Sequence, residues 1–267
     1  MDRHADRFAV NCSILFTELP VLERPAAAKA AGFDAVEFWW PFAEPVPTRA
    51  QQDEFVAALD DAGVSLIGLN FFAGDMPSGD RGVVSWPGRE EEVRDNAAVV
   101  AALGERTGCR AFNALYGKRV DGADADTQDK LALDNLTHVA AAVAEIGGTV
   151  LIEPVSGAAG YPLLTADDAV GVITALAERG TSNVGLLADL YHLHVNGDDV
   201  ARAIGTHAGR IAHVQIADAP GRNEPGTGEL DLGGYLDTIY GGGYTGWVGL
   251  EYKPSGASAD SFGWFTR

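Results

Sequence analysis

Strand-like and helix-like segments alternate along the whole chain, and this alternation limits the possible folds more than any other feature. Helical patterns such as 127–145, which has a broad apolar face, lie between short apolar segments typical of β-strands. Such an order predicts βαβ units and a parallel sheet. Since 267 residues are close to the roughly 250 of a (β/α)8 barrel, we predict a single-domain α/β TIM barrel over 1–267. The eight predicted strands are 8–14, 35–38, 65–70, 110–115, 149–153, 184–189, 211–215 and 247–251.

Local signals mark several helix ends. Thr48 and Thr165 are predicted N-caps, and Asp168 stands in the reciprocal position of a capping box with Thr165. Gly32 and Gly63 are predicted to end the first two helices. Further helices are predicted over 90–103, which begins with three Glu residues, and over 258–265; the long loop 71–89 has the length of a functional lid.

Four of the predicted strands deliver an oxygen-bearing side chain at their C-terminal ends: Glu153, Asp189, Gln215 and Glu251. In a parallel barrel these ends open onto one mouth, so the four side chains are expected to meet there. Two Glu, one Asp and one Gln supply only oxygen ligands, which favours Mg or Mn over zinc. The alternative for Glu153 and Glu251 is a pair of buried salt bridges, because an unpaired charge at an apolar strand end is costly.

Other polar residues at the predicted mouth are candidates for substrate binding. His192 follows Asp189 by three residues and is predicted to bind substrate hydroxyls or the metal, and Asn70 ends the third strand. Arg222, in the loop after the seventh strand, has the geometry to hold a carboxylate in bidentate fashion. Lys118 is a second candidate for an anion, followed by Arg81 and Arg89. For each of these residues the alternative is an ordinary loop charge or a hydrogen-bonded core histidine.

Charge and composition exclude several classes of protein. The formal net charge is −19, which disfavours nucleic acid as a partner. No apolar stretch approaches the roughly 20 residues of a membrane span, and no secretory signal precedes the first strand, so a cytoplasmic location is expected. Cys12 and Cys109 are predicted to be reduced thiols. A small-molecule substrate is the expected partner, and a homo-oligomer is compatible with the sequence.

The predicted ligands lie within longer strings that resemble the hydroxypyruvate isomerase family of the xylose isomerase-like barrels. The strings are 11–18, 31–38, 87–90, 151–154, 213–218 and 246–254. The resemblance implies that Glu153, Asp189, Gln215 and Glu251 hold the metal and that Glu153 and Glu251 also move the proton. It further implies the interconversion of hydroxypyruvate and 2-hydroxy-3-oxopropanoate (tartronate semialdehyde).

Other activities stay open at this point. The segment 69–72 departs from a His-Asn-Leu-Pro type of sequence that is frequent in the family. The similar 2-oxo-tetronate isomerases share most of the strings, and the more distant ketose 3-epimerases have His where Gln215 stands. A DNA-repair endonuclease of the same superfamily is disfavoured by the negative charge and the few histidines. A sugar-acid-binding protein without turnover is disfavoured because binding alone needs no second proton-transfer carboxylate.

Overall fold

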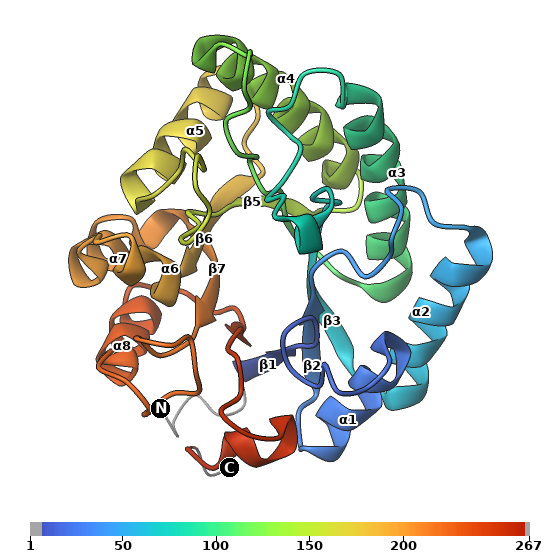
Figure 1. Ribbon diagram of the computed structural model, residues 1–267, viewed down its shortest axis with the longest axis vertical. Helices are drawn as coiled ribbons and strands as arrows, with labels where there is room; N and C mark the ends of the chain where they lie inside the picture. The colour runs from blue at the N-terminus through green and yellow to red at the C-terminus, as the bar shows by residue number, and fades with distance from the viewer. Residues whose placement is uncertain (1–6, 265–267) are drawn as a thin grey trace.

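The eight strands close into a parallel barrel, which confirms the predicted fold. The computed structural model describes residues 7–264. Each strand pairs with the next along the chain, and the last pairs with the first. Helices surround this ring, as Figure 1 shows. The strands are β1 (Phe8–Asn11), β2 (Ala35–Phe38), β3 (Ser65–Asn70), β4 (Ala111–Asn113), β5 (Thr149–Ile152), β6 (Val184–Asp189), β7 (Ile211–Ile216) and β8 (Val248–Leu250).

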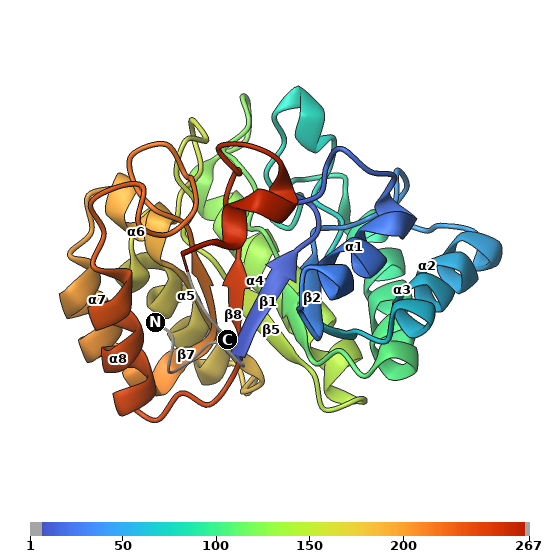
Figure 2. The same cartoon turned by 90° about the horizontal axis from the view of Figure 1, so that it is seen from below.

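The helices cover the outside of the barrel and bury their apolar faces against it. Figure 2 shows the strand arrows pointing toward the side where the long βα loops gather, so this side is the C-terminal mouth of the barrel. Within residues 7–264 no helix is both long and apolar enough to cross a membrane. The α-helices are α1 (Arg24–Ala30), α2 (Arg49–Ala62), α3 (Glu90–Thr107), α4 (Ala125–Ala144), α5 (Ala166–Glu178), α6 (Leu190–Val195), α7 (Val200–Thr206) and α8 (Leu232–Gly241).

Most predicted helix signals are confirmed. The side chains of Thr48 and Thr165 each accept a hydrogen bond from the backbone of the third following residue, in complete capping boxes. Gly63 ends α2 in the left-handed conformation, with φ of 64°, where a side chain would be strained. The end predicted at residue 103 was wrong: α3 continues to Thr107, because Gly108 is the residue that takes the left-handed conformation.

Three other predicted boundaries also differ. β1 ends at Asn11 because the backbone N–H groups of Ile14 and Leu15 turn back to the carbonyl of Asn11. β4 covers only residues 111–113. The closing segment is a short 3-10 helix, Ser258–Phe262, and residue 265 lies outside the described residues. The ends of the strands that carry the predicted ligands agree with the prediction to within one residue.

The long loop 71–89 is ordered by its own hydrogen bonds. Asp75 caps a 3-10 turn, Met76–Ser78, and Asp80 accepts from the backbone of Asp75 at 2.8 Å. Gly82 has φ of 95°, and a Cβ there would clash with the carbonyl of Leu115, so only glycine allows the loop to pack against the segment after β4. The loop thereby lies at the barrel mouth, beside the strand ends.

Candidate active site

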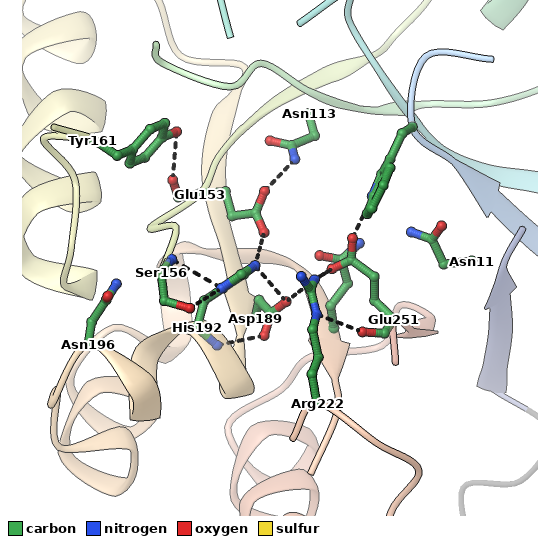
Figure 3. A network of polar contacts seen from close by, with 12 residues as sticks. Asn11, Asn113, Glu153, Ser156, Tyr161, Asp189, His192, Asn196, Arg222 and Glu251 are labelled. Carbon is green, nitrogen blue, oxygen red and sulfur yellow. Dashed lines mark hydrogen bonds and ion pairs between the residues drawn. The ribbon is translucent and has the colours of Figure 1, made fainter. Parts of the chain in front are cut away.

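Three buried carboxylates and a histidine converge at the C-terminal mouth of the barrel. Glu153 directly follows β5, Asp189 ends β6, and Glu251 directly follows β8. Figure 3 shows these side chains and His192 pointing toward one another. Each of the four offers one ligand atom, and those atoms lie within 4.8 Å of one another. The structure therefore brings together residues that are up to 98 positions apart in the sequence, counting from 153 to 251.

The carbonyl oxygen of Gln215 has no hydrogen-bond partner among the described residues. It lies on β7 in register with Asp189 on β6, and its Nε2 donates to Glu37 at 2.7 Å. The Oε1 of Gln215 and the Oδ2 of Asp189 are buried and make no hydrogen bond with the described residues. A buried polar atom without a partner is costly, and a bound cation would remove that cost.

The carboxylates strongly perturb one another's protonation. Burial, followed by repulsion from Glu251 and Asp189, raises the pKa of Glu153 well above its usual range. Burial also raises the pKa of Asp189, and it raises that of Glu251 to about 7 although the Arg222 guanidinium opposes the shift. Burial lowers the pKa of Arg222, but the three carboxylates outweigh it and the net shift is upward. Clustered acids of this kind favour a bound cation, which stabilises their ionised forms.

The donor set fits a hard divalent cation. Glu153, Asp189 and Glu251 carry three negative charges when ionised, and Arg222 carries one positive charge, so the net charge is −3 + 1 = −2. The carboxylate oxygens and the Gln215 carbonyl are the oxygen ligands that Mg and Mn prefer.

The hydrogen bonds of His192 assign the tautomer of its neutral ring. Its Nδ1 accepts from the backbone N–H of Ser156 at 3.1 Å, so the proton of the neutral ring lies on Nε2. Burial, followed by the charge of Arg222, lowers the pKa of His192 to about 3. Nε2 lies 3.7 Å from Asp189 Oδ2 and 4.0 Å from Glu153 Oε1. A neutral imidazole that carries its proton on the cavity side can donate to a substrate oxygen but has no lone pair there for a metal, so of the two predicted roles this geometry favours substrate binding.

Arg222 lies inside the site and is already paired. Its Nη2 is 2.9 Å from Glu251 Oε2 and 3.7 Å from Asp189 Oδ2, and its guanidinium stacks 5.5 Å from the centre of the Tyr191 ring. Its backbone is in the left-handed region, with φ of 59°, which is unusual outside glycine. Arg222 therefore compensates charge among the predicted ligands in addition to facing the cavity.

The cavity lined by Glu153 and Glu251 has a volume of about 80 Å³ and shares lining residues with a larger cavity of about 800 Å³. Trp39, Met76 and Arg81 line both cavities. Asn70 also lines the small cavity, as predicted from its strand end. Lys118 does not belong to this lining: a Cβ on Gly79 would lie 3.8 Å from its Nζ, which places Lys118 beside the loop 71–89.

Three residues that hydrogen-bond the predicted ligands were not predicted from the sequence. The indole N–H of Trp39 donates to Glu251 Oε1 at 2.5 Å. Asn113 donates to Glu153 Oε2 at 2.6 Å. Glu37 binds the amide of Gln215 from inside the barrel. For Glu37 a signal exists, because a carboxylate in the apolar strand 35–38 needs a partner.

Comparisons with known proteins agree with this architecture. Residues 25–267 match the family model described as "Xylose isomerase-like TIM barrel". A putative hydroxypyruvate isomerase of Streptomyces coelicolor is 51% identical over 97% of this chain and 95% of that protein. The hydroxypyruvate isomerase of Escherichia coli K12 is 32% identical over 97% of each chain. The 2-oxo-tetronate isomerase of Cupriavidus necator is 35% identical over 97% of this chain and 96% of that protein.

A solved structure shares the same fold and a related sequence. It is described as an AP endonuclease of family 2 from Brucella melitensis and has a TM-score of 0.87 at 34% identity over 97% of both chains. The closed parallel barrel, with acidic residues buried at its mouth, is thus a xylose isomerase-like TIM barrel. The chain belongs to the hydroxypyruvate isomerase family of these barrels, and it is an enzyme of the isomerase class.

Proposed function

We propose that this enzyme interconverts hydroxypyruvate and 2-hydroxy-3-oxopropanoate through an enediolate and depends on a divalent metal, Mg or Mn. The observation that carries the proposal is the pair of buried carboxylates, Glu153 and Glu251, which line one small cavity and cluster with Asp189 and His192. The names of the Streptomyces and Escherichia coli relatives support the substrate. The cavity of about 80 Å³ also suits a small acid better than a six-carbon sugar.

Glu153, Asp189, Gln215 and Glu251 would hold the metal in this proposal. A bound divalent ion supplies Lewis-acid polarisation of the substrate carbonyl, which acidifies the neighbouring C–H group. His192 donates its Nε2–H to a substrate oxygen, and this hydrogen bond strengthens as negative charge develops in the enediolate. The aromatic side chain of Trp39 covers one side of the cavity and limits the access of water.

The proton is moved by the two glutamates. One of them removes a proton from C3 of hydroxypyruvate, and the same or the opposite glutamate returns a proton to C2. The hydroxyl proton on O3 moves to O2 through the second carboxylate or a water molecule, so atoms and charge balance. Asn113 fixes one oxygen of Glu153 and Trp39 fixes one oxygen of Glu251, which keeps both bases in position.

Proton NMR in deuterated water tests the reaction directly. With Mg or Mn present, we expect the enzyme to convert hydroxypyruvate and to exchange solvent deuterium into the carbon-bound position of the product. The same assay with 2-oxo-tetronates and with a neutral ketose serves as the comparison. If a 2-oxo-tetronate is turned over much faster than hydroxypyruvate, the substrate assignment is wrong, although the isomerase mechanism stands.

The 2-oxo-tetronate isomerase activity is the second candidate. It is favoured by the relative from Cupriavidus necator and by the larger cavity that continues from the site past Met76 and Arg81. A ketose 3-epimerase is a more distant alternative. A DNA-repair activity, suggested by the name of the Brucella protein, is opposed by the net charge of −19 and by the single histidine in the cluster found among residues 7–264.

Arg222 is proposed to hold the substrate carboxylate, and its replacement should reveal this role. We expect Arg222→Ala to lower kcat/KM for hydroxypyruvate by about 2 to 4 kcal/mol, and Arg222→Lys to lower it less, because lysine keeps the charge but loses the two-pronged geometry. A neutral ketose should lose much less. Because Arg222 also contacts Glu251, the Mn affinity of each variant must be measured alongside.

Two matched variants identify the carboxylate-binding residue. Arg81→Ala removes a charge that lines both cavities and makes no ion pair with the described residues, and Lys118→Ala removes a charge outside the lining of the cavity that holds Glu153 and Glu251. If Arg81→Ala lowers kcat/KM for the acid selectively and Arg222→Ala affects acid and ketose equally, the carboxylate lies on Arg81. A selective loss in Lys118→Ala would assign it to Lys118.

A further inference from the structure

Glu37 is a buried carboxylate inside the barrel, below the predicted metal ligands. It lies on β2 with 2% of its surface exposed. Its Oε1 accepts from Asn11 Nδ2 at 2.9 Å and from Gln215 Nε2 at 2.7 Å, and its Oε2 is 2.6 Å from His213 Nε2. Three side chains from β1 and β7 therefore converge on one carboxylate that faces away from solvent.

Two glycines leave room for this carboxylate. A Cβ on Gly249 would lie 2.6 Å from Glu37 Cδ, and a Cβ on Gly68 would lie 3.2 Å from Glu37 Oε2. Both distances are shorter than ordinary van der Waals contact, so a side chain at Gly249 would displace the carboxylate. The barrel interior is thus built around the Glu37 head group at this level, where most TIM barrels pack branched apolar side chains.

The chemistry of an amide makes this contact directional. A primary amide has one donor end and one acceptor end, whereas a carboxylate only accepts. Contact with Glu37 therefore holds the NH₂ group of Gln215 inside the barrel and leaves Oε1 as the free end. That oxygen is buried and has no hydrogen-bond partner among the described residues. On its strand Gln215 is in register with Asp189, a member of the ligand cluster, so the two residues lie at the same level of neighbouring strands.

We infer that Glu37 is a positioning residue that fixes the orientation of the Gln215 amide and thereby presents its carbonyl oxygen as the neutral fourth metal ligand. The inference rests on the proposed function, since it concerns the same metal site. Without an acceptor at this place, the amide can turn and offer its NH₂ group to the cation, which is repulsive. Groups that orient metal ligands from behind commonly contribute about 10- to 100-fold to metal affinity.

Manganese binding to variants of Glu37 tests the inference without relying on activity. Glu37→Met removes the acceptor but keeps an unbranched side chain of similar length. We expect its Mn affinity, measured by calorimetry, to fall about 10- to 100-fold. Glu37→Gln keeps an oxygen that can accept from Gln215, so we expect it to recover most of the lost affinity.

A change of the ligand itself gives the decisive control. In Gln215→Glu both ends of the side chain at position 215 are carboxylate oxygens, so its orientation no longer affects metal binding. However, the new carboxylate lies against the carboxylate of Glu37, and the two repel each other. We therefore expect Gln215→Glu alone to bind Mn weakly and the double variant Glu37→Met/Gln215→Glu to bind it more tightly than either single variant. If Glu37 has a purely structural role, its loss should lower Mn affinity further, and the double variant should bind Mn more weakly than either single variant.

A variant far from the metal site distinguishes a loss of protein stability from a loss of the Gln215 amide orientation. Gln128→Met also removes a fully buried polar side chain, which hydrogen-bonds the carbonyls of Ser85 and Lys118 away from the ligands. It should lower Tm and leave Mn affinity unchanged. If Glu37→Met lowers Tm equally but binds Mn as the wild type does, Glu37 is a core residue and the inference is wrong. Wild-type protein that binds no Mn would instead overturn the metal site itself.

If Glu37→Met fails to fold, Gly249→Ala tests the same contact between Glu37 and Gln215, because it adds only one methyl group next to the Glu37 carboxylate. It displaces the Glu37 head group and removes no hydrogen-bonding side chain. We expect it to weaken Mn binding at least several-fold in folded protein. Unchanged Mn affinity in a folded Gly249→Ala variant would contradict the inference.

Discussion

Replacing Glu153 or Glu251 with glutamine is expected to lower kcat about a thousandfold or more, because each change removes a proton-transfer base and one negative charge from the metal site. The fold should survive. Glutamine has nearly the same shape as glutamate, and in Glu251→Gln the new amide can still accept the hydrogen bond from Trp39 through its carbonyl oxygen. The measurement is kcat for hydroxypyruvate at saturating Mn, together with Tm and the amount of bound Mn.

A carboxylate outside the site supplies the control for this prediction. Asp129 pairs with Arg119 and accepts from Tyr116, so Asp129→Asn tests the cost of losing a structural carboxylate. We expect a lower Tm and a kcat within a few-fold of the wild type. If Glu153→Gln or Glu251→Gln keeps near-native kcat with metal bound, that glutamate is also structural. The proton would then be moved by the other glutamate alone.

Removal of divalent metal is expected to abolish turnover, and Mg or Mn should restore it. Without a cation, burial and mutual repulsion raise the pKa values of the three carboxylates, so they tend to stay protonated. A bound cation would stabilise their ionised forms and release these protons. Substrate would then lose both its polarising group and the ionised bases. The measurement is kcat after dialysis against a chelator, with the metal content verified by elemental analysis, and again after each metal is added back.

Zinc is the matched comparison for that experiment. An all-oxygen ligand set that includes a neutral amide favours the harder ions, so zinc should restore less activity than Mg or Mn at equal occupancy. Full turnover in exhaustively metal-stripped protein would refute the metal site and leave only the isomerase fold.

The placement of the ligand candidates was predictable because a parallel barrel has one simple rule. Every strand ends at the same mouth, so Glu153, Asp189, Gln215 and Glu251 were expected to meet before any distance was known. The structure places the three carboxylates within one 4.8 Å cluster with His192, and Gln215 Oε1 has no hydrogen-bond partner within residues 7–264. Their binding of metal stays a prediction.

The boundaries of helices and strands were less predictable where the apolar pattern and the backbone turn end at different residues. The α3 helix runs four residues beyond its predicted end, since apolar periodicity fades before the glycine that stops it. The first strand was predicted three residues too long because Cys12 and Ile14 extend its apolar pattern into a turn. Apolar character alone does not distinguish a strand from a buried turn that closes its hydrogen bonds locally.

The sequence by itself determined the barrel, the strand ends that carry oxygen side chains and the acidic character that disfavours nucleic acid, because alternation, strand polarity and charge are local or additive properties. Only the tertiary structure decided which groups orient those ligands. Trp39 reaches Glu251 across 212 residues and Glu37 reaches Gln215 across 178, and no local pattern encodes such pairings. The tautomer of His192 and the pairing of Arg222 with Glu251 likewise depend on distances of a few ångströms, which exist only once the barrel has closed.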